Sequence, residues 1–257
     1  MEYIIICLAA FITAALTLFS GFGLGTLFLP VFALFFPLEV AIALTAIVHL
    51  LNNLLKFIML GRHADLGVLW RFGLPAIVAA GFGAQTLVWL SDLKPWLEYH
   101  LGSRYYQVMP VKVVVALLMI GFAMVELAPK FKHLAFEKRW LPLGGLLSGF
   151  FGGLSGHQGA LRSAFLIRSG LTPQSFIATG VVIACLVDLA RLSVYGTHMA
   201  GALTAGNLSV LVAATLSAFL GTFLGNRLLK KVTLAMMQIL VAVMLLLIAA
   251  GLGTGLI

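Results

Sequence analysis

The sequence has very few charged residues. Only 9% of its 257 positions are Asp, Glu, Lys or Arg, whereas 62% are apolar. A soluble domain carries about 25% charged residues, because these side chains cover much of its surface. The composition therefore excludes an ordinary soluble fold and predicts an integral membrane protein whose surroundings are the lipid bilayer.

Cysteines and dense basic stretches are also scarce. The two cysteines, Cys7 and Cys185, lie in apolar runs and cannot form a disulfide framework or a thiolate metal cluster. The net charge of +8 is scattered over short connections and forms no basic stripe for nucleic acid. We expect no metal, no cofactor and no nucleic-acid partner.

Long apolar runs dominate what is present. A membrane-spanning helix needs about 20 apolar residues. The runs predict an all-α membrane protein whose six spans are 38–60, 67–90, 111–127, 174–195, 203–224 and 232–252.

Two further apolar regions, 3–36 and 141–167, do not fit single spans. The first would be about 51 Å long as one helix, which exceeds a hydrocarbon core of about 30 Å. Closely spaced glycines interrupt both regions, at 21–25 and 152–159, and weaken a helix there. The arms of the second region are only about 18 Å long. Both regions are therefore predicted to be re-entrant helical hairpins.

An internal duplication relates the two halves of the chain. A shift of 135 residues places Ser20-Gly21 on Ser155-Gly156, Asn53 on Asp188 and Lys56 on Arg191. One hairpin and three spans give each half an odd number of crossings, so the halves must be inverted. The expected units are a first repeat at 1–128, a cytoplasmic linker at 129–138 and a second repeat at 139–257.

Basic residues favour the hairpin topology over eight simple spans. Eight spans would divide the extramembrane Lys and Arg six against seven. Hairpins instead leave only Lys94, Arg104 and Lys112 on one face. The other face, which the positive-inside rule places in the cytoplasm, collects Arg62, Arg71, Lys130, Lys132, Lys138, Arg139, Arg168, Arg227, Lys230 and Lys231. Both chain ends are then expected outside.

Three cations remain at membrane depth: Lys56, Arg162 and Arg191. A buried charge there costs at least a few kcal/mol, so each needs a partner or a function. Asp188 is the one clear acid at that depth. It lies one helical turn before Arg191, so it is either an ion-pair partner or a candidate coupling group. The excess of positive charge predicts an anionic substrate.

The glycine-rich breaks point to the same ligand. Backbone N–H groups at a helix start bind anions, and glycine lets a ligand approach them. A polar stripe of His49, Asn52 and Asn53 shares a helix with Lys56, and either joins helices or binds ligand. The candidate binding residues are Gly21, Gly23, Gly25, Thr26, Asn53, Lys56, Ser155, Gly156, His157, Gln158, Gly159, Arg162 and Arg191. For the glycines, close helix packing is the alternative role.

Glycine placement in the two halves resembles that of the sulfite exporter TauE/SafE family. Each half opens with a glycine-rich break, followed by a helix with a polar cluster and then a glycine-rich span, with Gly81 and Gly83 in one half and Gly221 and Gly225 in the other. The resemblance covers residues 19–252. It implies transport of small sulfur-containing anions such as sulfite, sulfonates or thiosulfate across the bacterial inner membrane, with no enzymatic activity.

Alternating access by the two inverted halves is the expected mechanism. Export of a monovalent anion needs no coupling ion, because a potential of about 100 mV supplies about 2.3 kcal/mol per charge. A homodimer is one candidate assembly.

Two other functions compete with a transporter. A passive anion channel would use nearly the same residues. A rhomboid-like intramembrane serine protease would use Gly153-Leu-Ser-Gly156 with His49 and Asn53, but it also needs a histidine on a later helix beside the serine, and His198 is expected in a connection.

Overall fold

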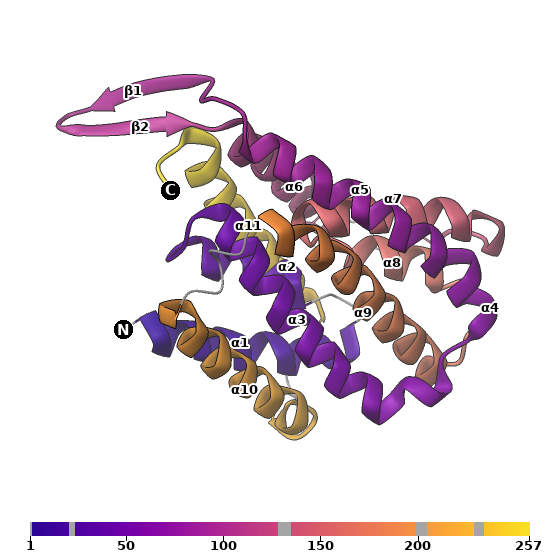
Figure 1. Cartoon of the computed structure of the whole chain (residues 1–257). Helices are drawn as coiled ribbons and strands as arrows, with labels where there is room; N and C mark the ends of the chain where they lie inside the picture. Colours follow the sequence, from indigo (N-terminus) through magenta and orange to yellow (C-terminus); the bar gives the residue numbers. More distant parts are fainter. Residues whose placement is uncertain (1, 21–23, 128–134, 199–204, 229–233) are drawn as a thin grey trace.

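The protein is almost entirely helical, as the computed structural model in Figure 1 shows. The structure describes residues 2–20, 24–127, 135–198, 205–228 and 234–257. Its elements are α1 Glu2–Ser20, α2 Leu24–Ala33, α3 Leu38–Leu60, η1 Gly61–His63, α4 Leu66–Val68, η2 Leu69–Gly73, α5 Leu74–Ser91, β1 Leu97–Leu101, β2 Arg104–Val108, α6 Pro110–Leu127, η4 Lys138–Trp140, α7 Leu141–Ser155, α8 Gly159–Leu166, α9 Pro173–His198, α10 Ala205–Leu228 and α11 Leu234–Thr254.

Long apolar helices account for most of the described chain. Within it, four helical stretches are long and apolar enough to cross a membrane: Leu38–His63, Leu66–Ser91, Pro173–Gly196 and Asn207–Leu224. The other two predicted spans hold shorter apolar helices, Pro110–Val125 and Val241–Thr254. These helices agree with the membrane protein that the composition predicts.

Prolines mark several helix starts. Pro110 and Pro173 are the first residues of α6 and α9. A proline is tolerated there because the first backbone N–H groups of a helix have no intrahelical acceptor. Pro75 in α5 has a further effect, since it cannot donate to the carbonyl four residues earlier. The helix adopts π geometry over Leu69–Gly73, just before this proline.

Helices from the two halves of the sequence pack against each other. α1 packs on α10, and α7 packs on α5; α3 packs on α9, and α6 packs on α11. In Figure 1, α3 and α9 lie side by side through the middle of the molecule. The first helix of each half therefore contacts a helix of the other half.

Glycines allow the closest of these contacts. Gly145, Gly149 and Gly153 recur every four residues and form one face of α7. A Cβ atom at these positions would overlap the backbone at Phe72, Ala76 and Ala80, respectively. Of these three glycines, only Gly153 belongs to the glycine-rich break at 152–159, and for it the structure shows close helix packing.

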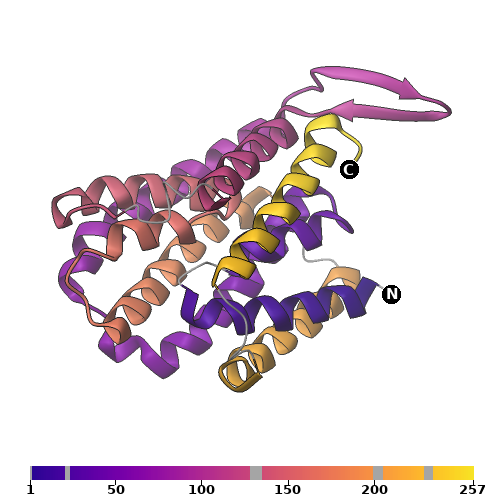
Figure 2. The ribbon, with the colours of Figure 1, turned by 180° about the vertical axis from the view of Figure 1, so that it is seen from behind.

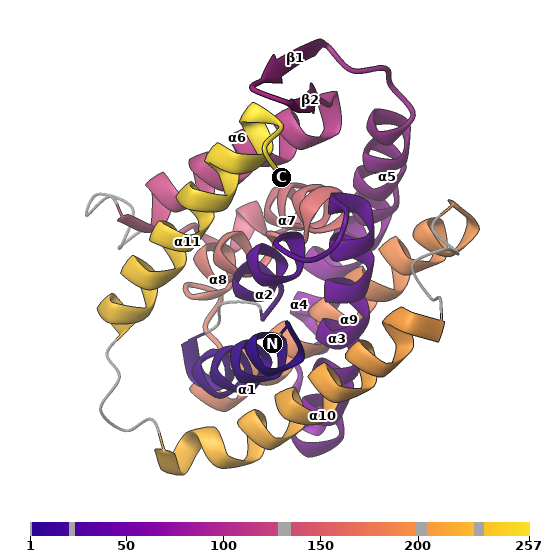
Figure 3. The same ribbon diagram turned by 90° about the vertical axis from the view of Figure 1, so that its left-hand side faces the viewer.

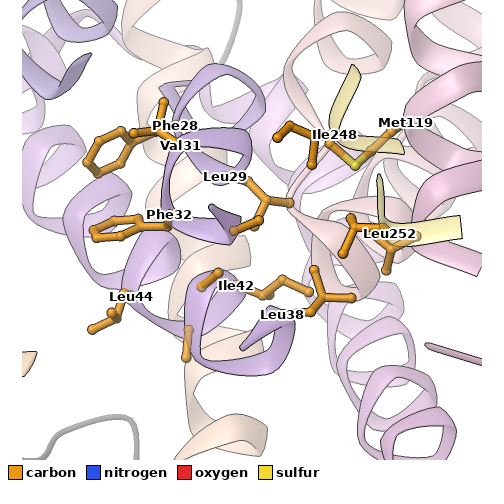
Figure 4. Close-up of a cluster of buried hydrophobic side chains, with 14 of the residues drawn as sticks. Phe28, Leu29, Val31, Phe32, Leu38, Ile42, Leu44, Met119, Ile248 and Leu252 are labelled. Atoms are coloured by element: carbon orange, nitrogen blue, oxygen red, sulfur yellow. The ribbon is translucent and has the colours of Figure 1, made fainter. Parts of the chain in front are cut away.

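The largest hydrophobic core joins α2, α3, α6 and α11 (Figure 4). Phe28 and Phe32 of α2 meet edge to face, with ring centroids 4.4 Å apart. Residues of α6 and α11, among them Met119 and Ile248, close the other side of this core. The core thus fixes the short helix α2 against two long helices.

A β-hairpin joins α5 to α6 and projects beyond the helices (Figure 1, Figure 2). Leu101 pairs with Arg104 across a two-residue turn, in which Gly102 has φ of 65°. Positive φ is favourable for glycine and suits a tight hairpin turn. The sequence predicts no helix or strand at residues 91–110, so this hairpin is an addition to the predicted fold.

Candidate functional site

The two helix breaks meet in the interior of the molecule. α1 ends at Ser20 and α2 begins at Leu24, while α7 ends at Ser155 and α8 begins at Gly159. A Cβ atom added to Gly25 would lie 3.4 Å from the Gly156 carbonyl oxygen and 3.8 Å from the His49 ring. Gly25 therefore brings the start of α2 against the tip between α7 and α8.

Gly156 shapes the second tip, which is the turn between α7 and α8 at residues 156–158. Its φ is 81°, a left-handed conformation that L side chains rarely adopt, and its N–H donates to the Gly152 carbonyl to close α7. Gln158 donates its backbone N–H to the Gly156 carbonyl at 3.0 Å. The chain thus reverses within three residues, and α8 starts with its N-terminal end at this tip.

Asp188 holds together residues of two helices beside the tips. The His49 Nδ1 atom of α3 lies 2.5 Å from Asp188 Oδ2, and Arg191 Nε donates to Asp188 Oδ1 at 3.0 Å. Arg191 also donates to the Gly152 carbonyl of α7 at 3.3 Å. All three side chains are buried. The ion pair of Asp188 with Arg191, one of the two predicted roles for this acid, is present.

Several buried polar atoms near the meeting tips and on α3 lack a hydrogen-bond partner. Among the described residues, His157 Nε2, Gln158 Nε2 and Asn52 Nδ2 have no hydrogen-bond partner. The second polar atom of two of these side chains has a hydrogen-bond partner. His157 Nδ1 lies 3.0 Å from Ser155 Oγ, and Asn52 Oδ1 accepts from Thr222. An unpartnered buried polar atom is costly, so the Gln158 and Asn52 amides are candidate donors to a ligand or water. His157 Nδ1 donates to Ser155 Oγ, whose own proton goes to the Phe151 carbonyl, so His157 Nε2 is a candidate acceptor.

Two buried cations lie close to this set. Lys56 is 5% exposed and Arg162 is 7% exposed. No described carboxylate forms an ion pair with either, and the hydrogen bond described for Arg162 is a long one, 3.5 Å to Gln158 Oε1. Lys56 and Arg162 are within electrostatic reach of each other. Arg162 is also within electrostatic reach of Asp188, whose charge His49 and Arg191 already share. This part of the site therefore carries uncompensated positive charge.

Among the predicted binding residues, Lys56 is one of the two buried cations just described, and the others fall into three groups. Gly25, Gly156, His157, Gln158, Gly159, Arg162 and Arg191 surround the meeting tips. Asn53 and Ser155 use their polar atoms within their own helices, as donors to the His49 and Phe151 carbonyls. Gly21 and Gly23 lie outside the described residues, and Thr26 belongs to α2.

Three residues of the site were not among the predicted binding residues. His49 reaches Asp188, Thr45 lies near Gly25, and Tyr195 donates its hydroxyl to the Gly153 carbonyl. The signal for His49 was available, because it precedes Asn53 by four residues and Lys56 by seven, which places all three on one helix face. Within the part of the chain described, no group of His, Cys, Asp or Glu could hold a metal ion.

Comparison with known proteins identifies the family of this chain. The family model described as "Sulfite exporter TauE/SafE" matches residues 6–252. Searches of curated proteins and of solved structures find no match for the chain. Because the family model covers nearly all of the sequence, the chain belongs to the sulfite exporter TauE/SafE family of membrane transporters.

Proposed function

We propose that the protein is a secondary transporter that carries a small sulfur-containing anion, such as sulfite or an organosulfonate, across the bacterial inner membrane. The observation that carries this proposal is the presence of unpartnered buried amide donors, on Asn52 and Gln158, one helical turn from Lys56 and Arg162, respectively. Sulfite and sulfonate groups present only hydrogen-bond acceptors and a negative charge. Such a ligand would satisfy the donors and neutralise the cations at once.

Helix ends add to this attraction. α2 and α8 both begin at the meeting tips, so the positive ends of their dipoles lie near the proposed anion. Gly159 places no side chain over the first backbone N–H groups of α8. The site thus combines backbone N–H groups, amide donors and two cations.

We propose that each half is a re-entrant hairpin followed by three spans, and that the halves are inverted. α7 and α8, with 15 and 8 residues, would be about 22 and 12 Å long, too short to cross a core of about 30 Å. The packing supports a twofold relation, since α1 on α10 corresponds to α7 on α5, and α3 and α6 each pack on their counterparts, α9 and α11. The proposed repeats are 1–128 and 139–257.

Alternating access follows from this arrangement. Relative motion of the two repeats would open the tips to one side of the membrane and then to the other. With the ten-charge face in the cytoplasm, the membrane potential favours export of an anion by about fiftyfold at about 100 mV. Figure 3 is consistent with this topology, because both chain ends lie toward the same end of the molecule.

Asp188 is retained as a candidate coupling group, although its carboxylate is already shared by His49 and Arg191. The two roles give different results for Asp188→Asn. An ion-pair role predicts a lower melting temperature with unchanged pH dependence of flux. A coupling role predicts that the pH dependence disappears.

A passive channel and a rhomboid-like protease remain the competing functions, and family membership favours neither. Saturable flux with counterflow excludes a channel. A serine protease would require labelling by a fluorophosphonate that Ser155→Ala abolishes.

Ligand-induced stabilisation tests the proposal directly. Purified protein is heated with sulfite, thiosulfate, methanesulfonate, sulfate or acetate, since a ligand raises the melting temperature by mass action. We expect sulfite or methanesulfonate to stabilise the wild type and not Arg162→Gln. Arg71→Gln removes an exposed arginine and serves as the control. No stabilisation by any sulfur anion, or equal stabilisation of Arg162→Gln, would contradict the proposal.

A further inference from the structure

We propose that Thr222 of α10 is a positioning residue of the anion site: its hydroxyl holds the Asn52 side chain so that the amide nitrogen, and not the oxygen, faces the anion. This inference rests on the anion transport proposed above and adds a residue of the second half of the chain to the same site. In this role Thr222 does not touch the anion and acts only through Asn52.

The Thr222 hydroxyl is directed away from its own helix. Four other threonines donate to the carbonyl four residues earlier in their own helix: Thr13, Thr86, Thr215 and Thr254. That local bond is open to any threonine inside a helix. Thr222 instead donates to Asn52 Oδ1 of α3 at 2.8 Å, and both side chains are buried. The bond therefore joins two helices, α3 and α10, that pack on each other.

The Asn52 and Gln158 amides share one arrangement. The oxygen of each amide is occupied, because Asn52 Oδ1 accepts from Thr222 and Gln158 Oε1 lies 3.5 Å from Arg162 Nη1. The nitrogen of each amide is buried and has no partner among the described residues. An anion only accepts hydrogen bonds, so this is the orientation in which both amides can bind it.

Asn52 also lies beside an unpaired cation. Lys56 follows Asn52 by four residues in α3, so the two side chains share one helix face. The neighbouring Asn53 amide, by contrast, donates to the His49 carbonyl of its own helix at 2.9 Å. Of the two adjacent asparagines, Asn52 is therefore the one that has a donor left for a ligand.

Thr222 is held in place by the packing of α10. A Cβ atom on Gly221 would overlap the Phe11 backbone, so α10 lies tightly against α1 at this level. The oxygen and nitrogen of an amide are nearly equal in size, so an Asn52 side chain could also turn its oxygen toward the anion. The bond to Thr222 disfavours that orientation, because turning the amide would break it.

Calorimetry on the purified full-length protein tests this role, with sulfite and methanesulfonate as probes. Thr222→Val keeps the side-chain shape but removes the hydroxyl. We expect its dissociation constants to rise at least about fivefold, which corresponds to the loss of one hydrogen bond. Thr222→Ser keeps the hydroxyl and should bind like the wild type. Thr215→Val removes a buried hydroxyl that donates within α10, and it should also bind like the wild type.

A double-mutant cycle separates positioning from packing. Asn52→Leu removes the amide at similar size, and Thr222→Val should cause no further loss of binding in that background. The double variant leaves neither polar partner of this pair behind, so it should fold even if Thr222→Val alone is unstable. If Thr222→Val does not fold, Thr222→Cys replaces it in the comparison, because a thiol is a weak donor.

The possible results separate this inference from the proposed function. Unchanged binding in the variant that lacks the hydroxyl would overturn the inference. A loss that Thr222→Ser also shows, or one that persists in the Asn52→Leu background, would overturn it as well. In these cases the wild type still binds the probes and the proposed function stands. If neither sulfite nor methanesulfonate binds to the wild type, the proposed function fails and this inference fails with it.

Discussion

Arg162 and Arg191 are both buried arginines, yet their surroundings differ. Arg191 neutralises Asp188, whereas Arg162 has no carboxylate partner among the described residues. Removing one member of a buried ion pair typically costs about 3–5 kcal/mol, because the other charge is left uncompensated. We therefore expect Arg191→Ala to lower protein stability strongly.

Arg162→Ala should have the opposite profile, with near-normal stability and at least tenfold weaker anion binding, because it removes a cation that has no internal partner. Melting temperature and sulfite binding, measured for both variants, check the contrast. Equal loss of stability in the two variants would show that Arg162 is also a structural ion-pair residue.

The three buried cations could be predicted from sequence because charges are so rare that each one inside an apolar run is conspicuous. The contact of His49 with Asp188 could not be predicted from the sequence. These residues are 139 positions apart, and their meeting depends on how α3 packs on α9. Periodicity places His49 on a helix face but does not say what that face contacts.

The helix pair α5 and α7 illustrates how glycine controls packing between elements. A Cβ atom on Gly83 would overlap the Phe150 carbonyl, whereas one on Gly81, two residues earlier in the same helix, would meet no atom within 4 Å. We expect Gly83→Ala to destabilise the protein by about 1–3 kcal/mol through overpacking.

Gly81→Ala is the matched control. Alanine favours helix over glycine by up to about 1 kcal/mol, so this variant should be neutral or stabilised. Thermal unfolding in detergent compares the two variants. Equal melting temperatures for both would contradict the close contact between α5 and α7.

The β-hairpin is anchored to α11 by one hydroxyl. Tyr99 donates to the Thr254 carbonyl at 2.6 Å. Tyr99→Phe should therefore cost about 0.5–1.5 kcal/mol and increase proteolysis in the hairpin. The Tyr106 ring stacks on that of Tyr99, and its hydroxyl has no hydrogen bond within the described chain. Tyr106→Phe should therefore have little effect. Equal cleavage rates in both variants would argue against the anchor.

Helices were easier to predict than this hairpin. Apolar runs of about 20 residues leave few alternatives in a membrane, because lipid cannot satisfy exposed backbone groups. The hairpin segment is instead exposed, mixes Tyr, Leu and charged residues, and its turn signal is only Gly102-Ser103. Such short exposed strands depend on neighbours such as α11 that the local sequence does not reveal.

The arrangement of the whole molecule predicts which loops face which side of the membrane. Ser103 lies in the turn of the β-hairpin, and Glu137 precedes η4 in the connection between the halves. In the proposed topology, Ser103→Cys reacts with an impermeant thiol reagent from outside, and Glu137→Cys reacts only after the membrane is opened. Labelling of both from one side would contradict an odd number of crossings between them.

Pairing between the halves is the feature of the molecule that the sequence predicted least. The proposed duplication was inferred from the repeated spacing of Gly, Asn or Asp, and Lys or Arg. The packing of α1 on α10 and of α7 on α5 was not visible in the sequence. It depends on glycine-lined helix faces whose partners lie far away in the chain. The duplication nevertheless indicated that the two breaks are equivalent, and they lie together around Gly25 and Gly156.

These two breaks are proposed to form an anion site with Lys56 and Arg162. Anomalous diffraction from crystals containing 2-bromoethanesulfonate would test it most directly, because the bromine atom marks the ligand. We predict one strong bromine peak beside Arg162, between α3, α8 and α9, with the sulfonate toward Gln158. A continuous helix through residues 20–24, or bromine found only at the membrane surface, would contradict the account.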